Sequence, residues 1–133
     1  MNLQSLLSKT IIIAIWFSMP FAVMAQDQPL LLKHGLYVQT GIACKDAPFA
    51  AMRSWDGHGF AGPHSSKCTS QVVLRHGNEY EVSTACSALG DGTPNPSGGV
   101  DKETLQLARI SNVSFVVGNN SKPKLTYRWC SAK

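Results

Sequence analysis

The residue types best suited to chemistry lie close together in one short segment of the chain. Asp56, His58 and His64 supply a carboxylate and two imidazoles, which are groups that ligate zinc and similar ions. Their spacing matches no established metal motif, and the sequence between the two histidines is rich in glycine and proline. The pattern favours exposed loop histidines, and a small metal-dependent hydrolase that uses these three residues is an alternative hypothesis.

Other catalytic patterns are weaker. Ser65 and Ser66 adjoin His64, but no nucleophile-elbow sequence surrounds them. Glu79 and Glu81 fall on the outward face of a predicted strand, where carboxylates are ordinarily solvated. We therefore expect a protein that is not an enzyme, with no catalytic residue, no bound metal and no cofactor.

Two aromatic residues, Trp55 and Phe60, flank an Asp-Gly pair, which is a signal for a hairpin turn. Aromatic side chains commonly fill a core. At the tip of a hairpin, they would instead form an exposed recognition patch. The tentative binding residues are Trp55, Asp56, His58, Phe60 and His64. The candidate surface is residues 55–66 together with the Gly/Pro-rich loop 90–101.

The four cysteines suggest two disulfides, because an even number in a small exported chain is typical of a disulfide framework. They are Cys44, Cys68, Cys86 and Cys130. Cys68 and Cys86 are expected to face each other across a hairpin. Facing Cβ atoms lie about 4.5–5.5 Å apart, whereas a relaxed disulfide needs about 3.8 Å. We therefore expect the sequential pairing Cys44–Cys68 and Cys86–Cys130 over the nested one.

The first residues predict export. Lys9 precedes an apolar run at 11–17, and Val23-Met24-Ala25 fits a signal-peptidase site. We expect residues 1–25 to be a signal peptide and residues 26–133 to be a single domain in the periplasm or outside the cell. The apolar run is interrupted and short of the roughly 20 residues of a membrane span, so no stable membrane insertion is expected after cleavage.

The formal net charge of +4 comes from dispersed charges. No basic stripe with interleaved aromatic residues is present, so we expect no nucleic-acid partner.

Residues 67–89 predict a central β-hairpin that turns at His76-Gly77-Asn78. One of its faces is mostly apolar and the other polar, so it must be half of a covered sheet. The expected facing pairs are Cys68 and Cys86, Ser70 and Thr84, Val72 and Val82, Leu74 and Tyr80, and Arg75 and Glu79.

The other segments also read as short strands between turn signals. Residues 36–42 predict a first strand, and residues 45–52 predict a short helical turn or a loop. Further strands are expected on either side of Asp56-Gly57 and at 103–110, 113–117 and 124–130. The pattern predicts an all-β antiparallel meander of seven or eight strands, either a small barrel or a two-sheet sandwich, with two disulfides.

The chain loosely resembles small uncharacterised proteobacterial periplasmic proteins that form a disulfide-stapled β-barrel. The matching residues are His34-Gly35-Leu36-Tyr37-Val38, Cys44, Trp55-Asp56-Gly57, Cys68, Cys86 and Tyr127-Arg128-Trp129-Cys130. It is also similar in architecture to periplasmic lysozyme inhibitors, although the Ser-Gly and Tyr-bearing inhibitory loop of that group is not recognisable here. These resemblances imply a β-barrel of the bacterial envelope.

Size, export and disulfides favour a non-enzymatic binding or inhibitor-like protein. The partner would be a protein or another envelope component, and the sequence does not define the oligomeric state. Besides the hydrolase, a structural envelope protein without a dedicated site is an alternative.

Overall fold

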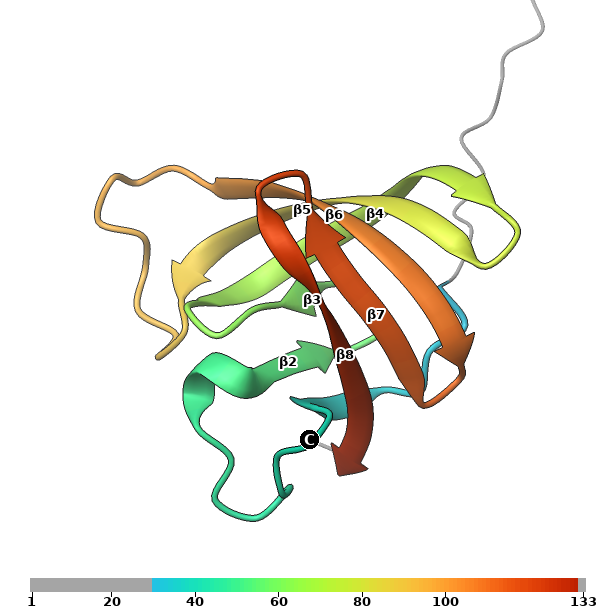
Figure 1. The fold of residues 1–133 in the computed structure, drawn as a ribbon. Helices are drawn as coiled ribbons and strands as arrows, with labels where there is room; N and C mark the ends of the chain where they lie inside the picture. The colour runs from blue at the N-terminus through green and yellow to red at the C-terminus, as the bar shows by residue number, and fades with distance from the viewer. Residues whose placement is uncertain (1–29, 132–133) are drawn as a thin grey trace, which may run out of the picture.

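The computed structural model describes residues 30–131, which form one antiparallel sheet of eight strands with the order β3-β2-β1-β8-β7-β6-β5-β4 (Figure 1). The sheet curls until its two outer strands meet. Ser70 N donates to His58 O over 2.8 Å, and Phe60 N donates to Ser70 Oγ over 2.9 Å. The predicted all-β meander is confirmed, and it takes the form of a nearly closed barrel. The predicted signal peptide lies outside the described residues.

The strands follow the chain almost without interruption by helix. They are β1 (Gly35–Gln39), β2 (Met52–Trp55), β3 (Phe60–Ala61), β4 (Ser65–His76), β5 (Glu79–Leu89), β6 (Asp101–Ser111), β7 (Ser114–Asn119) and β8 (Lys122–Ser131). Within residues 30–131 a single 3-10 turn, η1 (Phe49–Ala51), follows Pro48. It lies in residues 45–52, for which the sequence predicted a short helical turn or a loop.

The central hairpin of β4 and β5 has the predicted register in its outer part only. The pairs Cys68 and Cys86, Ser70 and Thr84, and Val72 and Val82 are confirmed. A bulge after Val72 then shifts the pairing by one residue, so Leu74 faces Glu81 and the turn contains only Gly77 and Asn78. The prediction that Leu74 shares the covered face is wrong. The bulge rotates the strand, and the side chain is 64% exposed.

The predicted disulfide pairing is also wrong, because the bridges are nested. Cys68 bonds to Cys86 with a Cα separation of 4.0 Å, and Cys44 bonds to Cys130 with a Cα separation of 5.7 Å. The two hairpin strands approach more closely at the cysteines than a typical facing pair does. Cys44 reaches Cys130 because β1 pairs with β8, although these two strands are far apart in the sequence.

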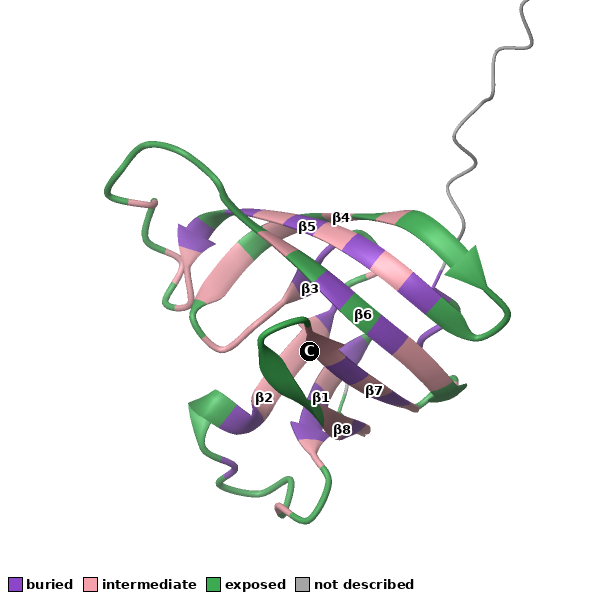
Figure 2. Cartoon of the chain, turned by 45° about the horizontal axis from the view of Figure 1, so that its top comes forward, coloured by how far each residue is buried: buried purple, intermediate pink, exposed green. Residues whose placement is uncertain are grey.

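The core is a cluster of rings and aliphatic side chains inside the barrel. Phe115 lies at its centre, with ring centroids 5.0 Å from Tyr37, 5.2 Å from Phe60 and 5.4 Å from Tyr127. Figure 2 shows buried and more exposed residues alternating along β5 and β6, as expected for strands with one covered face. The segment before β1 inserts Leu30 and Leu32 into this core.

The first strand differs in extent from its predicted range, 36–42. β1 ends at Gln39, and Tyr37 and Val38 are both fully buried although they point to opposite faces. This strand is therefore covered on both faces.

Candidate functional site

The two aromatic residues of the predicted binding set lie in the core. Trp55 is 7% exposed and Phe60 is 1% exposed, and their ring centroids are 6.3 Å apart. Each comes from a strand end next to the β2–β3 turn and points into the barrel. Their burial fits core packing and leaves no exposed aromatic patch at this turn.

Asp56 has a clear local role in the β2–β3 turn. Its Oδ1 accepts hydrogen bonds from the backbone N–H groups of His58, at 2.8 Å, and Gly59, at 2.7 Å. Partial burial raises the pKa of Asp56, but the hydrogen bonds from Gly59 and His58 outweigh it and the pKa is lowered. The carboxylate therefore closes the turn in its charged form.

The two histidines of the predicted set, His58 and His64, are both exposed. Residues 30–131 contain no group of three or more His, Cys, Asp or Glu side chains placed to hold a metal ion. The hydrolase hypothesis therefore has no preassembled ligand set in the described part of the chain.

The two segments of the predicted surface do come together. Gly90, which follows β5, packs so closely on the β3–β4 connection that a Cβ atom there would lie 2.7 Å from the carbonyl oxygen of Pro63. The loop beyond it is organised by Asp91, whose Oδ1 accepts hydrogen bonds from the Thr93 backbone N–H and hydroxyl. Residues far apart in sequence thus form one side of the barrel.

A cavity of about 260 Å³ lies at this contact, where the barrel closes incompletely. β3 is only two residues long, so it pairs with Ser54 and Trp55 and leaves the first half of β2 without a strand partner on that side. We call this opening the seam cavity. It is lined by Leu36, Phe49, Met52, Arg53, Ser54, Ala61, Gly62, Pro63, Ser65, Ser66 and Gly90.

Of the described residues that line the seam cavity, Arg53 alone is charged. Its guanidinium carbon lies 5.5 Å from the ring centroid of Phe60 and 5.8 Å from that of Tyr127, so the cation reaches the aromatic core. Its Nε and Nη1 atoms are buried and form no hydrogen bond. Buried donors of a charged group are normally paired. Tyr80 and Arg109 each have one buried side-chain atom without a partner, and among the described residues only Arg53 has two.

Sequence reasoning missed Arg53, although a signal was present. Arg53 and Trp55 are two positions apart on the same strand, so their side chains share a face. Once Trp55 is assigned to the core, the same alternation places Arg53 inside the barrel.

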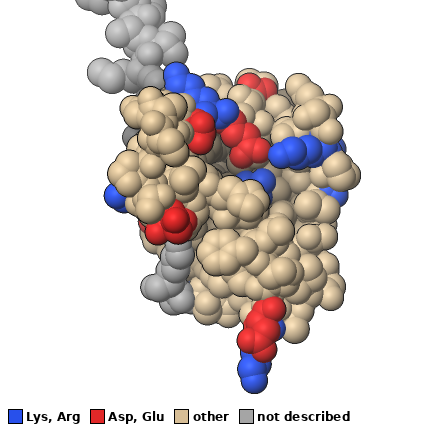
Figure 3. All heavy atoms as spheres, turned by 90° about the vertical axis from the view of Figure 1, so that its left-hand side faces the viewer, with Lys and Arg blue, Asp and Glu red and all other residues tan. Residues whose placement is uncertain are grey.

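The side of the barrel that carries the loop after β5 and the η1 segment has no single-sign charged patch. Figure 3 shows positive and negative side chains interspersed on the upper part of this face and at its lower tip, with a wide area of other residues between them. Long-range electrostatic attraction therefore does not single out this surface, and any recognition here depends on local groups.

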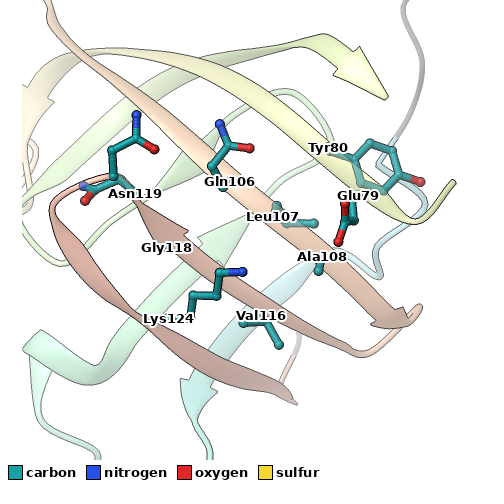
Figure 4. Close-up of a pocket in the computed structure, with 10 residues that line it drawn as sticks. Glu79, Tyr80, Gln106, Leu107, Ala108, Val116, Gly118, Asn119 and Lys124 are labelled. Carbon is teal, nitrogen blue, oxygen red and sulfur yellow. The ribbon is translucent and has the colours of Figure 1, made fainter. Parts of the chain in front are cut away.

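A larger hollow, of about 580 Å³, lies over β5–β8. Its side chains are spread out, from Glu79 and Tyr80 at one end to Asn119 at the other, with Lys124 between them (Figure 4). It carries both charge signs and no buried cation, because Lys124 is exposed. This β5–β8 groove serves below as a comparison surface.

The fold defines a class, a small antiparallel β-barrel with two disulfides. No family model, curated protein or solved structure matches this chain. Two disulfides are typical of proteins that fold in an oxidising environment outside the cytoplasm. Among residues 30–131, no helix has the length and apolar character needed to cross a membrane.

Proposed function

We propose that this protein is an exported, non-enzymatic binding protein of the bacterial envelope, periplasmic or secreted, which captures a protein or another envelope component. The observation that carries the proposal is the seam cavity. The two segments selected from the sequence meet there, and it contains a cation whose buried donors have no partner. The predicted signal peptide at 1–25 and the two disulfides support export.

The proposed contact surface is the rim of the seam cavity rather than the buried aromatic residues. Phe49 lines the cavity and is 64% exposed, so a partner can reach its ring without unfolding of the barrel. Exposed aromatic side chains beside a cavity are common anchors in protein recognition.

The proposal is tested by affinity capture from an envelope extract, with oxidised residues 26–133 as bait. Phe49→Ala truncates the rim, and Leu74→Ala is the matched control, because Leu74 is also 64% exposed but lies near the tip of the β4–β5 hairpin. We expect one abundant partner that is retained by Leu74→Ala and lost with Phe49→Ala.

Two outcomes would contradict the proposal. Equal capture by both variants would exclude the rim as the contact surface. If folded bait retains nothing from the extract, the result argues against a macromolecular partner. It then favours the alternative of a structural envelope protein without a dedicated binding site.

A further inference from the structure

We infer that the seam cavity binds a carboxylate group, held by the guanidinium of Arg53. The inference rests on the proposed function, because the site is the same cavity, and it specifies the chemistry of the ligand group that enters it.

A guanidinium is a cation with five N–H donors, so burying one is costly unless an anion or other acceptors pair with it. Two nitrogen atoms of Arg53 are buried without an acceptor. The rings of Phe60 and Tyr127 offer attraction to a cation but accept no conventional hydrogen bond. Among residues 30–131, no acidic side chain lines the cavity, so this part of the chain supplies no counter-charge there. An anionic acceptor would supply both the missing hydrogen-bond acceptor and the missing negative charge.

The rest of the lining indicates which anion fits. Ser65 Oγ accepts a hydrogen bond from Gly62 N over 2.9 Å, which leaves its own hydroxyl hydrogen free to donate. Leu36, Phe49 and Met52 provide an apolar wall in the same cavity. Ser54 and Ser66 also line the cavity, and Ser66 Oγ already donates to the Leu89 carbonyl oxygen. A single cation and a few hydroxyls beside apolar side chains suit a monocarboxylate with an aliphatic attachment better than a phosphate, whose three oxygens need more donors.

Gly62 marks the position for the carboxylate. A Cβ atom at Gly62 would lie 3.6 Å from Arg53 Nη1 and 3.4 Å from Ser65 Oγ, which are ordinary contact distances. Gly62 is not among the glycines with positive φ, so its backbone accepts a side chain. Gly62→Asp therefore introduces a carboxylate beside Arg53 and is expected to compete with any external one.

The experiment titrates oxidised residues 26–133 with hexanoate and, separately, with hexanamide, a neutral ligand of nearly the same shape. Binding is followed by isothermal calorimetry and by the Nε resonance of Arg53 in ¹⁵N NMR, which reports on the site without a substitution. We expect hexanoate to shift that resonance and to bind at least about tenfold more tightly than hexanamide.

Three variants locate the site. Arg53→Met removes the cation, and Gly62→Asp places a carboxylate where the ligand's carboxylate would lie. Lys124→Met is the control, because it removes one positive charge from the β5–β8 groove instead. We expect the first two to weaken hexanoate binding by at least about tenfold and the third to change it by less than about twofold. If Arg53→Met fails to fold, Gly62→Asp and the Nε resonance still decide the question.

The source of the carboxylate is distinguished by a short peptide ending in leucine, with a free or an amidated C-terminus. Binding that requires the free terminus identifies a chain-terminal carboxylate, whereas binding of hexanoate alone identifies a small carboxylic acid. Equal binding of hexanoate and hexanamide, or unchanged hexanoate affinity in both Arg53→Met and Gly62→Asp, overturns the inference.

Failure of the inference is separable from failure of the proposed function. If hexanoate and hexanamide bind equally while Phe49→Ala alone loses the envelope partner, the carboxylate site is wrong and the binding function stands. If hexanoate binds as expected but no partner is captured, the carboxylate site stands and the macromolecular partner is wrong.

Discussion

Cys68 and Cys86 face each other directly across β4 and β5, with Cα atoms 4.0 Å apart, and a disulfide joins them. The second bridge, between Cys44 and Cys130, spans 86 residues and fastens the loop after β1 to the end of β8. One disulfide thus reinforces a local hairpin, and the other joins the loop after the first strand to the last strand.

The nested bridges predict two different losses of stability. In the chain-entropy model, replacing both cysteines by alanine costs about 3 kcal/mol for the hairpin bridge and about 5 kcal/mol for the Cys44–Cys130 bridge. Denaturant unfolding of each double variant under oxidising conditions measures these values. Peptide mapping without reduction should recover both nested pairs, and a peptide that links Cys44 to Cys68 would contradict the structure.

Trp55 and Phe49 are expected to respond oppositely to truncation. Trp55→Ala removes a buried core ring and should lower the free energy of unfolding by about 3–5 kcal/mol. Phe49→Ala removes a ring that is 64% exposed, and should change it by less than about 0.5 kcal/mol. Chemical denaturation compares the two. A stable Trp55→Ala variant would show that this side chain is not part of the core.

Tyr37 should make the protein sensitive to strongly alkaline pH. Its hydroxyl donates to Lys33 O over 2.6 Å, and burial raises its pKa to about 12. Since the unfolded chain titrates near its ordinary value of about 10, the folded state holds the proton more tightly. This stabilisation is fully present below about pH 10 and is lost as pH rises to about 12.

The loss amounts to about 2–3 kcal/mol, from two pKa units. Urea unfolding at pH 9 to 12 measures it, and Tyr37→Phe is the control, because a ring without a hydroxyl has no proton to lose. An equal alkaline loss in Tyr37→Phe would assign the effect to other groups.

Gly59 is expected to resist substitution because the β2–β3 turn packs on β4 there. A Cβ atom at Gly59 would lie 1.8 Å from the carbonyl oxygen of Cys68, so Gly59→Ala must displace backbone. We expect it to cost about 1–3 kcal/mol, as overpacking commonly does. Gly99→Ala, in an exposed loop with its nearest contact at 3.5 Å, should be nearly neutral in the same thermal unfolding assay. A neutral Gly59→Ala would mean that the barrel does not close as described.

The central hairpin shows which features of the fold can be predicted from the sequence. Alternation and the Gly-Asn turn predicted both strands and the facing pair of Cys68 and Cys86, because these signals are local. The bulge after Val72 was not predictable, since one extra residue leaves the composition of a strand unchanged and depends on how the strand must twist.

The candidate site also has some features that local sequence signals predict and others that depend on tertiary packing. Hydrophobic alternation and turn residues act over a few positions, so they were enough to predict an antiparallel β protein and two turn-rich segments worth testing, and the four cysteines predicted two disulfides. The nesting of the bridges, the burial of Trp55 and Phe60, and the position of Arg53 at the seam became known from the folded chain. Each of these depends on which strands meet when the barrel closes. Which strands become neighbours is set by packing between residues that are distant in the chain, so it cannot be predicted from local sequence.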